Sequence, residues 1–373
     1  MRVLHVYSGN LFGGIETILL SLARHASKGV SHEFALCFDA RLAAELRSGG
    51  AVIHLLAPVR VSRPQTIRLA RRRLAALLAA RDIDVCVAHA PWSHALFAST
   101  VRNAGVPLAF WAHDVWSGRH WTERWARRAP PELLIANSVF TLRTLDEVFP
   151  RMPRDVVYAP IDIEHVAMAS AERAAVRAEL STPDGAVVIV QASRLEAWKG
   201  HTTLLHALAA LDRESPWICW IAGGAQRPAE RRYERSLRAD ASRLGIADRL
   251  RFVGERRDVP RLLAAADVYC QPNSAPEPFG IVFIEALAAG LPVLTSGIGA
   301  AVEIVDESCG RLVAARDAAG WRAELASLVD DASLRARLGA AGPRRAVSLC
   351  DPTRQLERLH VALRSIARET VAE

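Results

Sequence analysis

VYCQPNSAPEPFGIVFIEALAAGLPVLT, residues 268–295, contains the pattern that decides the fold of this chain. Two short apolar runs, 268–271 and 292–295, flank a helical pattern at 281–288. Apolar runs of strand length that alternate with helices are typical of parallel sheets covered on both faces. We therefore predict two parallel strands here, with a helix between them.

The same alternation extends along the whole chain and occurs twice. The expected strands are 2–7, 33–38, 52–56, 85–89, 108–112 and 133–136 in the first half, and 186–191, 217–222, 250–253, 268–271 and 292–295 in the second. This pattern predicts an α/β fold of two Rossmann-like, doubly wound domains. Ligands bind outside the carboxyl ends of parallel strands, so we expect the domains to face a central cleft that holds two substrates.

The domain boundary is predicted near Ala159-Pro160-Ile161-Asp162, where a proline interrupts the periodicity. The N-terminal domain then comprises residues 1–162 and the C-terminal domain residues 163–351. Asp351 and Pro352 resemble a helix start, and we expect the last helix, within residues 352–373, to pack back on the first domain.

The composition excludes several classes of protein. The chain has 373 residues, of which 51% are apolar and 23% charged. No apolar stretch reaches the roughly 18 residues of a membrane-spanning helix, and the start lacks the pattern of a secretory signal. The six scattered cysteines lack metal-site spacing, which favours reduced, buried thiols. We therefore expect a cytoplasmic protein.

Positive charge is concentrated in the first half of the chain. Residues 1–170 contain 20 Arg and Lys against 14 Asp and Glu, a difference of +6 within a total of +7. Six arginines lie close together at the start of an expected helix: Arg60, Arg63, Arg68, Arg71, Arg72 and Arg73. One interpretation is a patch that binds anionic lipid or a phosphorylated acceptor, with peripheral contact to the inner face of a membrane. The other is a solvated helix face. No nucleic-acid-binding motif accompanies them, so nucleic acid is not an expected partner.

Two cations bracket a loop in the second half. Arg194 ends a strand, and Lys199-Gly200 opens the next helix. Together with the helix N-terminus, these cations can neutralise a diphosphate. They can also be ordinary surface cations, but Lys28 and Lys199 are the only lysines among 47 basic residues. A lysine in so arginine-rich a chain favours a specific role.

Two glutamates flank the loop within the opening stretch. Glu285 lies in an otherwise apolar helix, where a carboxylate is costly unless a group bonds to it. Paired ribose hydroxyls are suitable partners. Glu277 precedes the helix, at a position from which it can accept hydrogen bonds from a sugar. In the first domain, Gly13 and Gly14 follow the first strand and suit either an anion at a helix N-terminus or a simple tight turn.

Arg194-x4-Lys199-Gly200 followed by Glu277-x7-Glu285 resembles the donor-site signature of the retaining glycosyltransferases of the GT-B fold, family 4. The resemblance spans essentially the whole chain and is closer in the second domain than in the first. It implies transfer of a hexose-type sugar from a nucleotide diphosphate sugar, with UDP or GDP, to a glycan or lipid-linked acceptor. The implied pathways are envelope polysaccharide or glycolipid biosynthesis.

The resemblance also implies a role for each matching residue. Arg194 and Lys199 would bind the diphosphate and stabilise it as it leaves, Glu285 would hold the ribose, and Glu277 would hold sugar hydroxyls. The other implied contacts are Gly13 and Gly14 with the diphosphate, His113 with the sugar, Val253 and Gly254 with the base, and Phe279, Gly280 and Ile281 with sugar or phosphate. The resemblance therefore implies that no metal cofactor is needed. Members of this family retain anomeric configuration without an assigned protein nucleophile.

The sequence departs from the family pattern at Ser193, where glycine is usual, and at Ala159-Pro160-Ile161-Asp162, where Pro-Asn-Gly is usual. Neither change removes a charged group. Two other functions remain open: an isomerase similar to the nucleotide-sugar 2-epimerases, which share this architecture, and a non-catalytic subunit that binds nucleotide sugars. The spacing of the four charged residues resembles the transferases more closely.

Overall fold

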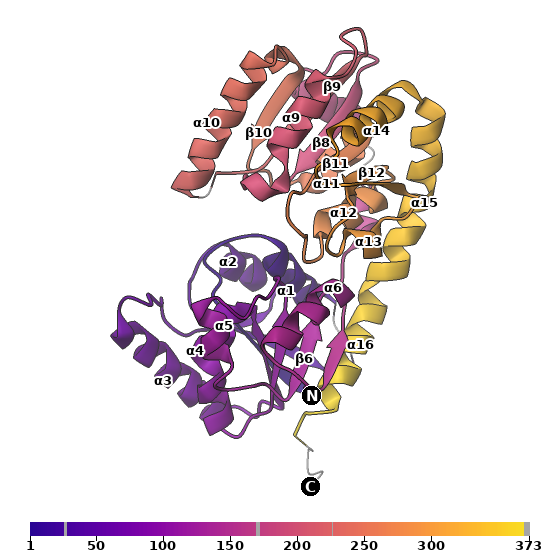
Figure 1. Ribbon diagram of the computed structural model, residues 1–373. Helices are drawn as coiled ribbons and strands as arrows, with labels where there is room; N and C mark the ends of the chain where they lie inside the picture. Colours follow the sequence, from indigo (N-terminus) through magenta and orange to yellow (C-terminus); the bar gives the residue numbers. More distant parts are fainter. Residues whose placement is uncertain (26–27, 169–171, 226, 369–373) are drawn as a thin grey trace. The chain divides into compact units, whose positions relative to one another are not determined.

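The computed structural model describes residues 1–25, 28–168, 172–225 and 227–368 (Figure 1). The chain divides into two compact units, one of Met1–Ile161 with Pro352–Glu373 and the other of Asp162–Asp351. The predicted boundary after Asp162 differs from this division by one residue. Residues 369–373 of the expected last helix lie outside the described part of the chain.

The first unit contains a parallel sheet of seven strands. Its elements are β1 (Arg2–Tyr7), α1 (Gly14–Arg24), β2 (Ser31–Leu36), α2 (Arg41–Ser48), β3 (Val52–Leu55), α3 (Pro64–Ala80), β4 (Val85–His89), α4 (Ala90–Asn103), β5 (Leu108–Ala112), α5 (Trp121–Ala126), β6 (Leu133–Ala136), α6 (Val139–Thr144), η1 (Leu145–Glu147), β7 (Arg154–Val156) and, from the end of the chain, α16 (Pro352–Arg364). The strand order is β3-β2-β1-β4-β5-β6-β7.

The second unit contains a parallel sheet of six strands. Its elements are α7 (Ile163–Met168), α8 (Arg173–Glu179), β8 (Val187–Ala192), η3 (Ala197–Lys199), α9 (His201–Ala209), β9 (Trp217–Ala222), α10 (Pro228–Arg243), η4 (Ala247–Arg249), β10 (Leu250–Gly254), α11 (Val259–Ala265), β11 (Val268–Gln271), α12 (Ile281–Ala288), β12 (Val293–Ser296), α13 (Ala301–Ile304), β13 (Gly310–Val313), α14 (Ala318–Asp330) and α15 (Ala332–Cys350). The strand order is β10-β9-β8-β11-β12-β13.

The central strands explain why these sequences form covered parallel sheets. Every residue of β5, β8 and β9 is buried, so both faces of these strands are packed against other elements. The large buried side chains include Trp111 in the first unit and Trp220 and Trp321 in the second. All six cysteines are buried and none forms a disulfide. The prediction of two Rossmann-like α/β domains is confirmed.

In each sheet the strand order reverses once, between β1 and β4 and between β8 and β11. Chain connections leave in opposite directions at such a point, which opens a crevice at the carboxyl ends of the two strands. Ligand sites are therefore expected in the loops that follow these four strands.

Two strands, β7 and β13, are absent from the sequence prediction. Both are outermost strands, and β7 contains Arg154 and Asp155 while β13 contains Arg311. A strand at the edge of a sheet needs less apolar surface than a central one, so its sequence lacks the apolar run on which the prediction relied.

Helix α16 contacts the first unit through polar and apolar residues. The Gln355 side chain accepts a hydrogen bond from the backbone N–H of Tyr158 at 3.0 Å. The Arg358 guanidinium pairs with the Asp155 carboxylate at 2.5 Å. Leu359 and Leu363 are fully buried. Helix α16 is thus part of the N-terminal unit.

Candidate active site

Two loops meet at the carboxyl edge of the second sheet, where its strand order reverses. Residues 193–200 connect β8 to α9, and residues 272–280 connect β11 to α12. Strands β8 and β11 are neighbours and parallel, so both loops leave the sheet at the same edge. Residues far apart in the sequence are brought together there.

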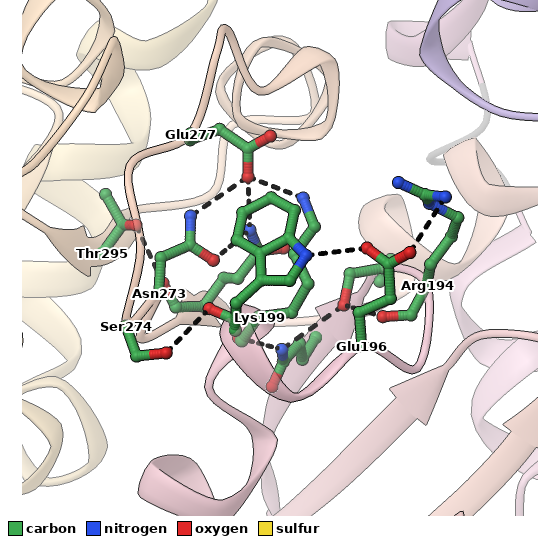
Figure 2. Close-up of polar contacts among 12 residues, drawn as sticks. Arg194, Glu196, Lys199, Asn273, Ser274, Glu277 and Thr295 are labelled. Carbon is green, nitrogen blue, oxygen red and sulfur yellow. Dashed lines mark hydrogen bonds and ion pairs between the residues drawn. The ribbon is translucent and has the colours of Figure 1, made fainter. Parts of the chain in front are cut away.

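Lys199 and Glu277 form a buried ion pair between these loops (Figure 2). The Lys199 Nζ lies 2.6 Å from Oε2 of Glu277, and the two side chains are only 11% and 9% exposed. The same oxygen accepts hydrogen bonds from the side-chain amides of Gln271 at 3.1 Å and Asn273 at 3.0 Å. Among the described residues nothing donates to Oε1 of Glu277. One carboxylate oxygen is therefore held by three donors, and the other can accept from a ligand.

Close contacts fix the two loops to each other. The backbone N–H of Ser274 donates to the Trp198 carbonyl at 2.8 Å, and the Lys199 ammonium lies 4.0 Å from the centroid of the Trp198 ring. Gly200 has a φ of +78°, and a β-carbon there would lie 1.7 Å from the carbonyl oxygen of Pro272. Only glycine fits where the loops cross.

Arg194 is the more exposed of the two predicted cations. Its guanidinium lies 3.0 Å from Oε1 of Glu196, and 43% of its side chain is exposed. Oε2 of Glu196 accepts a hydrogen bond from the indole N–H of Trp198 at 2.8 Å. Glu196 therefore orients Arg194 from within the same loop, without removing it from solvent.

Glu285 lies on α12, where its neighbours Ile284 and Ala286 are fully buried. Within the described residues its carboxylate has no hydrogen-bond or ion-pair partner. Burial in these apolar surroundings raises the pKa of Glu285 from 4.5 to about 7. Glu285 itself is partly exposed. An unpaired carboxyl in such surroundings, still open on one side, is expected where a ligand supplies the missing hydrogen bonds.

The loop before α12 turns at Gly280, which has a φ of +97°. A β-carbon at this position would lie 2.4 Å from the ring of Phe283, so the turn requires glycine. Phe279 is buried, and Ile281 is the first residue of the helix. The peptide groups at 279–281 therefore lead into a helix N-terminus, which carries partial positive charge.

Val253 and Gly254 lie at the end of β10, and Gly254 is exposed with a φ of +70°. In the sheet, β9 and β8 lie between β10 and β11. Val253 and Gly254 are thus at the same carboxyl edge as Lys199, but on a strand at the sheet's margin.

The other predicted residues belong to the first unit. Gly13 and Gly14 form the start of α1, Gly14 is exposed, and Gly13 has extended backbone with a φ of −175°. His113 follows β5 and is 6% exposed. Its Nε2 lies 3.0 Å from Nδ1 of His89, its Nδ1 has no partner in the described residues, and burial lowers its pKa to about 3. His113 is neutral at physiological pH.

The sequence reasoning missed four residues of the second-unit site: Glu196, Trp198, Gln271 and Asn273. A signal for two of them was present, because Gln271 and Asn273 are polar residues at the end of a buried strand. Glu196 and Trp198 lie inside the loop between the two predicted cations, but their contacts depend on the fold of that loop.

In the described ranges no group of three or more His, Cys, Asp or Glu has an arrangement suited to a metal ion. Across the same residues, no helix combines the length and apolar character that crossing a membrane requires.

Comparison with known proteins assigns both halves of the chain. Residues 172–345 match the family model of the glycosyl transferases group 1, and residues 12–165 match that of Glycosyltransferase Family 4. A GDP-mannose-dependent monoacylated alpha-(1-6)-phosphatidylinositol monomannoside mannosyltransferase of Corynebacterium glutamicum is 30% identical over 285 residues, which are 72% of this chain and 73% of that protein. A D-inositol 3-phosphate glycosyltransferase of Streptomyces avermitilis is 38% identical over 183 residues, 47% of this chain, and the match spans only 39% of that relative's length.

Solved structures share the fold. The crystal structure of Anabaena Alr3699/HepE in complex with UDP and glucose has a TM-score of 0.87 at 24% identity, over 98% of this chain and all of that one. WaaG, a glycosyltransferase involved in lipopolysaccharide biosynthesis, has a TM-score of 0.74 at 18% identity, over 97% of this chain and 99% of that one. With two Rossmann-like domains, matches to both family models and a relative aligned over most of its length, this chain belongs to the glycosyl transferases of group 1, Glycosyltransferase Family 4, which have the GT-B fold.

Proposed function

We propose that the chain transfers a hexose-type sugar from a nucleotide diphosphate sugar to a glycan or lipid-linked acceptor with retention of configuration, in envelope polysaccharide or glycolipid biosynthesis. The observation that carries this proposal is the buried Lys199–Glu277 pair at the strand-order reversal of the second sheet. The family membership supports glycosyl transfer. The UDP and GDP-mannose in the names of similar proteins support a nucleotide-sugar donor.

In this proposal the donor diphosphate binds between Arg194 and Lys199. Arg194 is exposed and its guanidinium can bind a phosphate through two N–H groups, while the Lys199 ammonium is a buried point charge. As the bond from the sugar to the diphosphate breaks, negative charge grows on the phosphate. Fixed cations in a water-poor site stabilise that charge, and one such group contributes about 10²–10³ in rate. No metal cofactor is required in this scheme.

Glu277 binds hydroxyls of the transferred sugar through Oε1, because Oε2 is occupied by its three donors. Glu285 binds the paired hydroxyls of the ribose, which supply the partners that the apolar helix lacks. The peptide groups of Phe279, Gly280 and Ile281 contact sugar or phosphate, and Val253 and Gly254 contact the base.

In the first unit, Gly13 and Gly14 approach the diphosphate and His113 lies at the sugar. The remaining surface of this unit receives the acceptor. Five arginines of the basic segment, Arg60, Arg63, Arg68, Arg72 and Arg73, are exposed, which supports contact with an anionic acceptor or with the inner face of a membrane.

A ligand-stabilisation screen with UDP-, GDP- and ADP-sugars tests the proposal. A donor present at a hundredfold excess over its Kd stabilises the fold by ~2.7 kcal/mol, which is a clear rise in melting temperature. NMR of the product made from the selected donor and glycan or lipid-linked acceptors then reads the anomeric configuration. Conversion of the donor alone into an epimer would favour an isomerase instead, and no stabilisation by any donor at millimolar concentration would contradict the proposal.

A further inference from the structure

The end of strand β11 carries two side-chain amides that are buried as deeply as the apolar core. Gln271 is fully buried, and Asn273, just beyond the strand, is 1% exposed. We call these two residues the amide pair. A buried amide is costly unless its N–H groups and its oxygen are bonded, so the partners of the amide pair indicate what it holds.

The strand places the amide pair at the end of a line of polar groups. Side chains alternate along a strand, so Tyr269 and Gln271 lie on one face, while Cys270 between them belongs to the apolar cluster on the other face. Tyr269 is also fully buried. This line of buried polar groups leads along the strand to Glu277.

The neighbouring strand β12 fixes the backbone of the amide pair. Oγ1 of Thr295 donates to the Gln271 carbonyl at 2.8 Å, and Oγ of Ser296 donates to the Asn273 carbonyl at 2.6 Å. The backbone N–H of Asn273 also donates to the Gln271 carbonyl at 3.0 Å. Both amide groups are therefore attached to a part of the chain that is bonded to the sheet.

The carboxylate of Glu277 determines which way each amide faces. Nε2 of Gln271 donates to Oε2 of Glu277 at 3.1 Å and to Oδ1 of Asn273 at 2.9 Å, so both of its protons are used. Nδ2 of Asn273 donates to the same Oε2 at 3.0 Å. If the Gln271 amide were turned over, its oxygen would face two other acceptors, so one orientation is strongly preferred.

Tyr269 holds the Gln271 amide in that orientation from the other side. Its hydroxyl donates to Oε1 of Gln271 at 2.7 Å. Burial, and then the negative charge of Glu277, raise the pKa of Tyr269 well above its ordinary value, so the hydroxyl keeps the proton that it donates. Within the described residues no hydrogen bond joins Tyr269 to Glu277. Tyr269 therefore acts on the carboxylate through Gln271.

The amide pair and Lys199 together occupy one oxygen of Glu277. Oε2 receives three donors, and a carboxylate oxygen has about two lone pairs, so no further donor is accommodated there. Figure 2 shows the other oxygen turned away from these contacts. Oε1 is therefore the atom that Glu277 presents to a ligand, and a carboxylate oxygen only accepts hydrogen bonds.

We propose that Gln271 and Asn273 are positioning residues that hold Glu277 with Oε1 toward the transferred sugar, and that this fixed acceptor selects a donor sugar with a hydroxyl at the position it contacts. The inference rests on the proposed function and deepens it. A sugar that lacks this hydroxyl would leave Oε1 desolvated and unpaired. Sites that bond a substrate hydroxyl reject such analogues strongly.

The amide pair is needed because Lys199 has a second task in the proposed function. Its ammonium also binds the donor diphosphate, so two anions compete for one cation. Lysine is a point charge on a flexible stem, whereas the amide groups are fixed by the sheet and by Tyr269. When the diphosphate attracts the ammonium, the amides still bond to Oε2 and keep Glu277 in place.

Binding of donor analogues to the full-length protein tests the proposal without an acceptor. The probes are the UDP- or GDP-sugar that stabilises the protein most and the analogues that each lack one hydroxyl of its sugar, titrated by calorimetry. In wild type the loss of at least one hydroxyl should raise Kd by about 10- to 100-fold. We call this ratio of Kd values the hydroxyl preference. Glu277→Ala should abolish it at one position, which identifies the hydroxyl that Oε1 binds.

Two further variants test the action through Gln271. Gln271→Met removes the amide with little change in size, and Tyr269→Phe removes only the hydroxyl that orients it. The hydroxyl preference at the identified position should fall about tenfold in Gln271→Met, and by less in Tyr269→Phe. Preferences at other positions and the Kd of the nucleotide diphosphate alone should change little. Both Kd values come from one sample, so a loss of folded protein does not alter their ratio, and the mild Tyr269→Phe covers the case in which Gln271→Met does not fold.

Gln191→Met is the matched control. Gln191 is a fully buried glutamine at the end of the neighbouring strand β8, but its amide donates to the Lys199 carbonyl at 2.8 Å and not to Glu277. It should retain the wild-type hydroxyl preference at every position. An unchanged preference in Gln271→Met or in Tyr269→Phe, or an equal loss in Gln191→Met, would overturn the role of the amide pair.

Failure of the proposed function gives a different result. If no UDP- or GDP-sugar binds at millimolar concentration, the proposed function is contradicted, and the inference with it. If a donor binds but no single hydroxyl matters, or the critical hydroxyl does not depend on Glu277, the inference is overturned and the proposed function stands.

Discussion

The Nζ atom of Lys199 and Oε2 of Glu277 lie 2.6 Å apart, although the residues are 78 positions apart in the sequence. The pair is buried and forms at the carboxyl ends of the neighbouring strands β8 and β11. A diphosphate bound at Lys199 would interact with the same ammonium that pairs with Glu277. A sugar held by Glu277 would therefore lie beside the positive charge of Lys199. The leaving group and the transferred sugar can therefore be recognised by one linked pair.

Loss of one partner of this pair should destabilise the fold. Lys199→Met leaves a buried carboxylate whose charge is no longer compensated, which should lower the free energy of unfolding by about 3 kcal/mol, measured by urea titration. The matched change is Arg194→Met in the same loop. Because Arg194 is exposed and its partner Glu196 is partly exposed, that variant should lose less than about 1 kcal/mol. Equal losses in the two variants would contradict the importance of the buried pair.

The Lys199 and Glu277 substitutions should not be additive. The double variant Lys199→Met, Glu277→Gln lacks both buried charges, so no unpaired charge is left. It should therefore be more stable than the sum of the single losses predicts. The coupling energy from the double-mutant cycle should exceed about 1 kcal/mol. Additive losses would mean that the two charges act independently.

Glu285 should make stability fall as pH rises. Its folded pKa of about 7 lies above the unfolded value, so between about pH 4.5 and 7 the folded state holds a proton that the unfolded state has lost. The contribution is most favourable below pH 4.5 and is lost as pH rises through 7. Glu285→Gln should therefore unfold at a higher urea concentration than wild type at pH 8, with little difference at pH 4. Lower stability of the variant at pH 8 would show that the carboxylate already has a stabilising partner.

Gly200 should be intolerant of any side chain. Gly200→Ala combines a positive φ with a 1.7 Å approach to Pro272, so it should lower the free energy of unfolding by about 3 kcal/mol or more. Gly185→Ala is the control, since Gly185 has a φ of +75° and open space around it. It should cost about 1 kcal/mol. Similar losses would show that the loops separate easily at Gly200.

The exposed arginines of α3 should bind anionic membranes. Replacing Arg68, Arg72 and Arg73 by Gln should weaken sedimentation with phosphatidylserine vesicles by about 1 kcal/mol per residue, and added salt should weaken wild-type binding. Arg231, Arg232 and Arg235 on α10 provide an equally charged control. An equal effect of the two sets would indicate unspecific charge attraction and no defined membrane-facing surface.

The sequence predicted the two-domain fold because the central strands are continuous apolar runs, which short-range patterns detect. It missed β7 and β13, whose charged residues are acceptable only at the edge of a sheet. It singled out Arg194, Lys199, Glu277 and Glu285, because charges beside buried strands or in an apolar helix are conspicuous. It did not predict that Lys199 and Glu277 bond to each other, since that contact depends on the order β8-β11.

The central claim is that Arg194, Lys199, Glu277 and Glu285 form a nucleotide-sugar donor site. Calorimetric titration with UDP and GDP at pH 8 tests it most directly, with wild type, Arg194→Met, Glu285→Gln and the control Arg235→Gln. We expect saturable binding of one of the two nucleotides, weakened at least about tenfold, or 1.4 kcal/mol, by Arg194→Met and by Glu285→Gln, and unchanged in Arg235→Gln. Wild-type affinity in both site variants, or no binding of either nucleotide at millimolar concentration, would contradict the account.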